Sequence, residues 1–198
     1  MLIILVGVAG ILVPLFPDVQ QRTHGSTGAD NMKEIAKAVE LHKATTGAYP
    51  NDWDSLIDAN GILAAATDLQ ALDLTAGVGP VVLAALNDAG ISRAYQHTDF
   101  ADASINQTFE GVGATDSIAA NEVAELTATG ITNLGLEPTG TGIAAYVALG
   151  LGGQSTMIGR SMVDAPVHYL EGGESPIENY ARWVVVFAVP NNGPLRLA

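Results

Sequence analysis

Residues 1–17 read MLIILVGVAGILVPLFP and contain no charged side chain. Soluble domains rarely leave so large an apolar surface uncovered, so this stretch constrains the organisation of the whole chain. As a helix it would extend about 25 Å, just short of the ~30 Å hydrocarbon core of a bilayer. Three interpretations are open: a secretory signal peptide, a transmembrane anchor, and a stem that packs against the stems of other copies.

The residues themselves favour the stem. No basic residue precedes the apolar run and no small-x-small cleavage site clearly follows it, as a signal peptide would require. Gly7 and Gly10 would weaken a lone membrane helix, whereas in a stem they let neighbouring backbones approach closely. Residues 2–16 are therefore expected to contact the same segment of other copies. The predicted packing residues are Leu2, Ile3, Ile4, Leu5, Val6, Val8, Ile11, Leu12, Leu15 and Phe16.

An interruption of the stem helix is predicted within residues 13–29. Proline lacks a backbone donor and clashes with the preceding helical turn, and each glycine costs a helix about 1 kcal/mol. The residues expected to break the helix are Pro14, Pro17, Gly25 and Gly28.

A second helix is expected after this break. Asp30 or Asn31 can cap its start. Gly47 is expected to end the helix, and Pro50 forbids its continuation. Apolar positions recur at the i, i+3, i+4, i+7 spacing of an amphipathic helix. The stripe consists of Met32, Ile35, Ala36, Val39 and Lys43.

Charge divides the 198-residue chain into two parts. Residues 1–47 contain four basic and four acidic side chains and are neutral. Residues 48–198 contain 17 acids against four basic residues and carry the whole net charge of −13. This asymmetry predicts a neutral stem of residues 1–47 and an acidic head of residues 48–198. It also argues against nucleic-acid binding, which requires a basic face.

The motifs around the second helix resemble a known family. Gly10-Ile11-Leu12, Pro17 and Thr46-Gly47-Ala48-Tyr49-Pro50 occur in the order seen in type IV pilins, above all in the major pseudopilin of the type II secretion system. In that family a short helical segment with an aliphatic pair follows the turn, here residues 53–57. The resemblance covers about residues 2–63. The family's glutamate after the leader cleavage point has no counterpart in residues 2–5.

The resemblance implies a structural subunit of a type IV pilus-like or pseudopilus filament, not an enzyme. It implies that the chain polymerises with itself into a helical homopolymer. The inner membrane would hold the precursor, the pilus assembly machinery would be a partner, and the product would be an extracellular filament at the cell surface. The alternative is a membrane-anchored surface binding or adhesion module that does not polymerise. The amphipathic continuation from Met32 to Lys43 favours the polymer.

The predicted fold class is α+β, with a long N-terminal stem helix interrupted near Pro14–Gly28 and a head of short helices packed on an antiparallel sheet. Residues 59–74 are Ala- and Leu-rich and are predicted to be helical. Gly79-Pro80 is expected to open a short helix that ends at Gly90. Strands are expected at residues 91–97, 143–149, 165–170 and 182–189, the last of them buried on both faces.

No motif in the sequence strongly indicates a catalytic or cofactor-binding site. The chain has no cysteine, so disulfides and thiolate chemistry are excluded. Gly140-Thr141-Gly142-Ile143-Ala144-Ala145 matches a loose dinucleotide fingerprint, but it leads into a predicted strand instead of a helix and is interpreted as a glycine-rich turn. His97 and Asp99 are interpreted as a surface polar pair.

Two acidic loops are the candidates for calcium, which takes several oxygen ligands. Neither has recognisable ligand spacing, so both are interpreted as solvated loops and no cofactor is expected. The residues are Asp99, Asp102, Asn106, Glu110 and Asp116 in the first loop, and Glu171, Glu174, Glu178 and Asn179 in the second.

Overall fold

The structure is a computed structural model that describes residues 15–58, 68–97, 115–117, 122–166 and 183–198. For residues 15–29 the description covers the backbone only. The chain divides between Lys37 and Ala38 into two units, the second of which contains the sheet.

Helix α2, Leu15–Thr46, runs for 32 residues without a break. The predicted interruption is therefore wrong over residues 15–29. Pro17 lies in the first turn of the helix, where backbone N–H groups have no intrahelical acceptor, so its missing donor costs little. Gly25 and Gly28 keep their backbone donors and acceptors, so each lowers helix propensity without removing a bond. Pro14 lies outside the described residues.

The C-terminal end of α2 confirms the predicted stop. Gly47 adopts the left-handed conformation at φ 82°, and its N–H donates to the carbonyl of Lys43 at 2.8 Å. Such a residue without Cβ is the usual terminator of a helix. Among residues 30–46 of the helix, whose side chains the structure describes, the buried positions are Ile35, Ala38, Val39 and His42. Of the predicted stripe, Met32 and Ala36 are exposed and Lys43 is half-buried.

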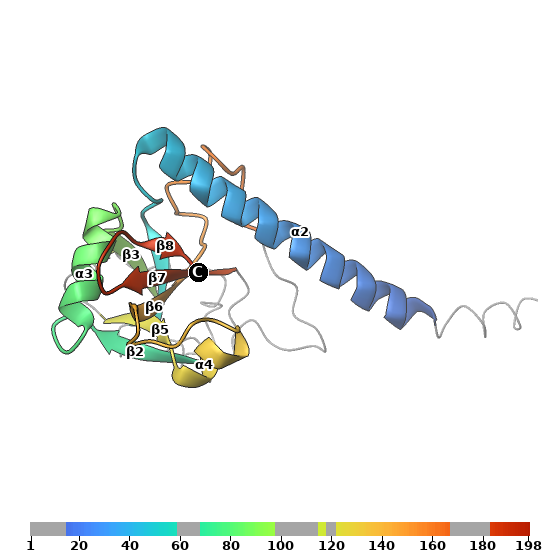
Figure 1. The fold of residues 1–198 in the computed structure, drawn as a ribbon. Coiled ribbons are helices and arrows are strands. Elements are labelled where there is room, and N and C mark those ends of the chain that lie inside the picture. The colour runs from blue at the N-terminus through green and yellow to red at the C-terminus, as the bar shows by residue number, and fades with distance from the viewer. Residues whose placement is uncertain (1–14, 59–67, 98–114, 118–121, 167–182) are drawn as a thin grey trace, which may run out of the picture. The chain divides into compact units, whose positions relative to one another are not determined.

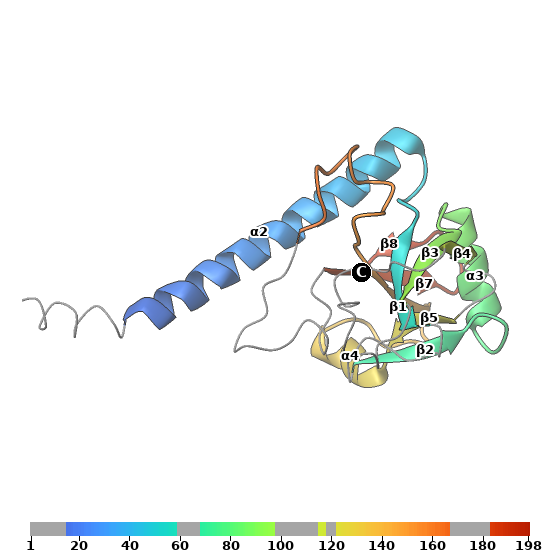
Figure 2. The ribbon, with the colours of Figure 1, turned by 180° about the vertical axis from the view of Figure 1, so that it is seen from behind.

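Eight strands form one sheet in the second unit (Figures 1 and 2). In chain order they are β1 (Trp53–Asp58), β2 (Leu69–Asp73), β3 (Arg93–His97), β4 (Thr115–Ser117), β5 (Glu122–Leu126), β6 (Ile143–Gly150), β7 (Val184–Pro190) and β8 (Arg196–Leu197). Their order across the sheet is β2-β5-β6-β1-β3-β4, with β7 paired to β6 and β8 paired to β7.

The predicted fold class is contradicted by this sheet. The pairing of β1 with β3 is parallel, so the sheet is mixed and not antiparallel. Residues 53–57, expected to be helical from the family resemblance, form β1, and residues 69–73 of the predicted helix 59–74 form β2. Strand β1 lies between β3 and β6, and such a position overrides weak local helix propensity. The sheet dominates the described head, and helices α3 and α4 have only 10 and 6 residues.

The two longest described strands, β6 and β7, contribute many of the core residues. They pair along their whole length, from Ile143 with Pro190 to Gly150 with Val184. The strand expected at 143–149 is therefore confirmed. Strand β7 is buried on both faces only at residues 187–189, because Val184 is 39% exposed and Val186 and Pro190 are half-buried. Residues 165–166 of the strand expected at 165–170 are not in a strand, and the remainder lies outside the described residues.

Two short helices accompany the sheet. Helix α3, Gly79–Asp88, contacts β6 and buries Val82 and Leu86, which confirms the helix expected between Gly79 and Gly90. Helix α4, Ala128–Asn133, contacts β5 and is capped by Thr127, whose hydroxyl accepts from the N–H of Gly130 at 3.1 Å. Among the helices that the structure describes, none combines the length and apolarity needed to cross a bilayer.

Candidate functional site

The segment Gly47–Leu56 joins the end of α2 to the first strand and gathers the contacts that fix the two together. We call it the junction. It includes Tyr49 and Pro50, which the family resemblance had singled out. After Gly47 turns the chain, the N–H of Tyr49 donates to the carbonyl of Ala89 at 2.8 Å. Gly90, at φ 89°, lies so close that an added Cβ would come within 2.6 Å of the Cβ of Ala48.

Aromatic rings anchor the junction in the core. The ring of Phe187 on β7 meets Tyr49 edge-on at 5.3 Å between centroids and Trp53 edge-on at 5.6 Å. The Trp53 indole N–H donates to the carbonyl of Pro50 at 2.6 Å. All three rings are buried, with Trp53 and Phe187 fully so. Edge-to-face pairs of this kind add to the stabilisation from burial alone.

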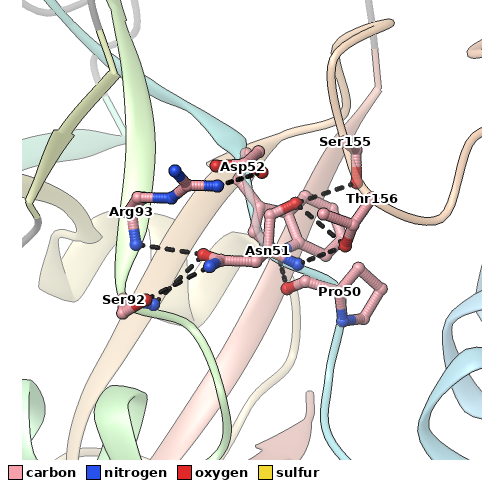
Figure 3. Close-up of polar contacts among 8 residues, drawn as sticks. Pro50, Asn51, Asp52, Ser92, Arg93, Ser155 and Thr156 are labelled. Carbon is pink, nitrogen blue, oxygen red and sulfur yellow. Dashed lines mark hydrogen bonds and ion pairs between the residues drawn. The ribbon is translucent and has the colours of Figure 1, made fainter. Parts of the chain in front are cut away.

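Asn51 connects three distant segments (Figure 3). Its side-chain oxygen accepts from the N–H groups of Ser92 and Arg93, at 3.1 and 3.0 Å, and its amide donates to the Ser92 hydroxyl at 3.1 Å. On the other side, its backbone N–H donates to the hydroxyl of Thr156 at 2.8 Å, and its carbonyl accepts from the Thr156 N–H at 3.0 Å. The start of β3 and the loop after β6 are thereby held to the junction.

Two aspartates follow Asn51 in buried positions. Asp52 has φ 60°, a left-handed conformation that aspartate tolerates better than most residues, and it forms an ion pair with Arg93 at 2.8 Å. Asp54 is completely buried. Gly152 packs against it so closely that an added Cβ would lie 2.5 Å from Oδ1 of Asp54. The two aspartates are thus held in closely packed positions at the start of β1.

A hollow of about 530 Å³ lies beside the junction. One side comes from α2 and the junction, another from α3 and a third from the turn before β8. Lys43 donates to the Tyr49 hydroxyl at 2.8 Å and lies 4.1 Å from the ring centroid. Two of the residues that line the hollow are charged, Lys43 with its ammonium group and Asp88 with its carboxylate, and the others are uncharged. Its lining residues are Lys43, Gly47, Ala48, Tyr49, Ala85, Asp88, Ala89, Gly193, Pro194 and Leu195.

These contacts suit positioning and binding better than covalent chemistry. The Ser155 hydroxyl is buried and donates to the carbonyl of Asn51 at 3.4 Å, which is a structural role. Within the described segments, no three acidic or histidine side chains gather as a metal site.

Gly140 turns the chain shortly before β6. It has φ 101°, and its N–H donates to the carbonyl of Ile143 at 2.8 Å. The glycine-rich turn is therefore confirmed for residues 140–142, and residues 143–145 already belong to β6, the strand into which the turn was expected to lead.

Several predicted residues are not tested by the described part of the chain. The packing residues Leu2 to Leu12 lie outside it, as do all the calcium candidates except Asp116. Leu15 and Phe16 are in α2, and Asp116 is in β4, but their side chains are not described. His97 ends β3, while Asp99 lies outside the described residues.

Sequence reasoning missed Asn51, Arg93 and Thr156 as partners. Their hydrogen bonds connect residues 41 to 105 positions apart, a separation that no local pattern reveals. The available signal was the position of Asn51 directly after a proline and before an aspartate, since Asn and Asp favour turns.

No family model, curated protein or solved structure matches this chain. The resemblance carried by the N-terminal motifs therefore stays a prediction.

Replacing Asn51 by alanine is expected to reduce the free energy of unfolding by about 1–2 kcal/mol, because three side-chain hydrogen bonds are lost while the backbone bonds to Thr156 remain. Urea denaturation measures the change. Asn133→Ala is the matched control, since Asn133 makes one exposed bond, to Asp68 at 3.1 Å, and should change stability by less than about 0.5 kcal/mol. Equal effects of the two substitutions would show that Asn51 does not hold the junction together.

His42 predicts a pH dependence of stability. It is buried, and its Nδ1 has no hydrogen-bond partner. Burial, and secondarily the charge of Arg160, lowers the pKa of His42 below the usual value of 6.5. The unfolded chain then binds the proton more tightly than the folded chain. Stability should therefore fall as pH drops below about 6.5, by at most ~1.4 kcal/mol per unit from this group.

His42→Gln should flatten this dependence. The measurement compares urea midpoints of the two proteins at pH 7.5 and pH 5.5, a range that lies above the titration of ordinary carboxylates. The other histidines are present in both proteins, so the difference between the slopes isolates His42. Parallel slopes would rule out His42 as the titrating group.

Proposed function

We propose that this chain is the structural subunit of a type IV pilus-like or pseudopilus filament and that it polymerises through its N-terminal residues 1–47. The observation that carries the proposal is the division of α2. Its residues from Ala38 onward belong to the unit that contains the sheet, whereas residues 15–37 belong to the other unit. Residues 15–37 of α2 are therefore not part of the compact unit that contains the sheet.

The composition of that segment supports a need for partners. Most of the stability of helices in proteins comes from packing against other elements, and two glycines weaken the intrinsic helix propensity of this segment. Of its residues 30–37, all but Asn31 and Ile35 are exposed, including Met32 at 55%. The sequence before it is the charge-free run of residues 1–17. Association with other copies would cover the apolar run and the exposed Met32, at about 25 cal/mol per Å² of apolar area buried.

On this proposal the junction has a mechanical role. It connects the C-terminal end of α2 to the sheet through the rings of Tyr49, Trp53 and Phe187 and through the hydrogen bonds of Asn51. The expected partners are other copies of the chain, the inner membrane before assembly and the pilus assembly machinery. The expected location is an extracellular filament at the cell surface.

A second candidate is a membrane-anchored binding module, and two observations favour it. Residues 18–31 read DVQQRTHGSTGADN, so this part of α2 has almost no apolar side chain with which to pack in a fibre core. A helix that is polar all round suits a spacer surrounded by solvent. The hollow beside Tyr49 is the place where such a module would hold a ligand.

Electron microscopy of the purified full-length chain after detergent removal distinguishes the two functions. Filaments are expected, and Ile11→Glu should abolish them because a carboxylate in an apolar interface must be desolvated. Val163→Glu is the control, because Val163 is 93% exposed in the head and its substitution should leave filaments intact. Circular dichroism checks that both variants fold. Dispersed single particles, or filaments that tolerate Ile11→Glu, would overturn the proposal.

A further inference from the structure

Helix α3 presents apolar side chains on its outward side as well as on its buried side. Its buried side consists of Gly79, Val82 and Leu86. Val81 is nevertheless 45% exposed, and Val78, directly before the helix, is 42% exposed. Pro80 and Ala84 are also exposed. We call Val78, Pro80, Val81 and Ala84 the α3 face. Figure 1 shows α3 at the outside of the sheet, and the exposed fractions of Val78 and Val81 show that these side chains are not covered.

The charge around this surface is unlike that of the head as a whole. Residues 74–92 contain one charged side chain, Asp88, and exposed Asp73 lies directly before them, in a head with 17 acids against four basic residues. The hollow beside the junction continues the uncharged surface, because Ala85 and Ala89 of the α3 region line it. Its two charged lining residues, Lys43 and Asp88, have opposite signs. The α3 face and the hollow thus form a nearly neutral area on an acidic head.

We propose that the α3 face is a contact surface for the head of a second copy of this chain. Two heads, each with a charge of −13, repel each other wherever acidic surfaces approach within about 8–10 Å, the distance over which salt screens. A neutral apolar area lets two copies meet without that repulsion, and burying it contributes favourable free energy. An anionic membrane is a poor alternative partner, because the acidic head is repelled from it. The inference rests on the proposed filament, where heads crowd together.

The contact is expected to be of the head-to-tail kind. Helical filaments are generated by interfaces in which two different surfaces meet, so the α3 face of one copy would meet another surface of the next. Loss of this contact should weaken filament assembly without preventing it, because contacts between stems stabilise the filament separately.

Photo-crosslinking tests the contact in the full-length chain. A photoreactive residue placed at Val81 should give covalent dimers and higher oligomers of the chain, and the same residue at Val163 should give at least tenfold less. Val81→Glu should raise the lowest concentration that supports filaments at least tenfold, while Val163→Glu should leave it unchanged. Ala84→Glu is a second variant on the same exposed face, and circular dichroism verifies that each variant folds.

The outcomes separate this inference from the proposed function. If filaments form but crosslinking at Val81 equals that at Val163 and Val81→Glu assembles normally, the inference is wrong and the filament stands. If no filaments form but Val81 still crosslinks copies selectively, the contact is real and the filament proposal fails. Crosslinking of Val81 only to other proteins, or to nothing, overturns the inference.

Discussion

Phe187→Ala is expected to destabilise the head by about 3–5 kcal/mol, the range for removing a large buried aromatic side chain. Phe187 is fully buried and is the ring that both Tyr49 and Trp53 contact. Its loss leaves a cavity beneath the junction and removes two edge-to-face pairs at once. Since ordinary domains are stable by only ~5–15 kcal/mol, a large fraction of the variant should be unfolded or easily unfolded.

Val184→Ala is the matched control on the same strand. Val184 is 39% exposed, so its truncation should cost less than about 1 kcal/mol. Urea denaturation followed by tryptophan fluorescence measures both changes, because Trp53 adjoins the cavity. A cost below about 1.5 kcal/mol for Phe187→Ala would mean that the three rings do not form the packing centre of the junction.

Gly79→Ala is expected to reduce the free energy of unfolding by about 3 kcal/mol, the upper end of the range for inserting extra atoms into a packed core. A Cβ at this position would collide with the carbonyl oxygen of Asp73 and would lie 2.6 Å from the Cα of Leu74. Both are backbone atoms, which cannot move aside as a flexible side chain would. Helix α3 would have to shift away from the end of β2, taking Val82 and Leu86 from the core.

Gly142→Ala provides the comparison for this substitution. An added Cβ there meets no atom within 4 Å, and the residue is outside the left-handed region. Alanine should be neutral or stabilise by up to about 1 kcal/mol, because it restricts the unfolded chain. Differential scanning calorimetry of the two variants checks the contrast. Similar melting temperatures for both would contradict the close packing of Gly79 against β2.

Local signals in the sequence predicted several elements well. The end of α2 was predictable, because Gly47 and Pro50 act within one turn of the chain. So was α3, where Gly79-Pro80 and Gly90 mark both ends, and so was β6, with its continuous apolar run from Ile143. In each case the residues that determine the element lie within it or next to it, so the pattern alone contains the information.

The failures lie where distant contacts outweigh local preference. Residues 53–57 became a strand because β3 and β6 pair with them on either side, with a bulge that places Leu56 at φ 61°. The predicted break in α2 failed because Pro17 falls in the first turn, where helices accept proline. The sequence predicted only part of the junction. Tyr49 belongs to a recognisable motif, but the partners of Asn51 are residues 92, 93 and 156, which no local pattern connects to it.

The 105-residue separation between Asn51 and Thr156 also has a consequence for the order of folding during synthesis. A ribosome adds about 5–20 residues per second, so Thr156 emerges roughly 5–20 seconds after Asn51. During that interval α2 and its junction are already made but lack one of the segments that fix them. Closing so long a loop is entropically slow, and the contacts that close it form late. Removal of the Thr156 hydroxyl, which accepts from the N–H of Asn51, should accordingly accelerate unfolding far more than it slows folding.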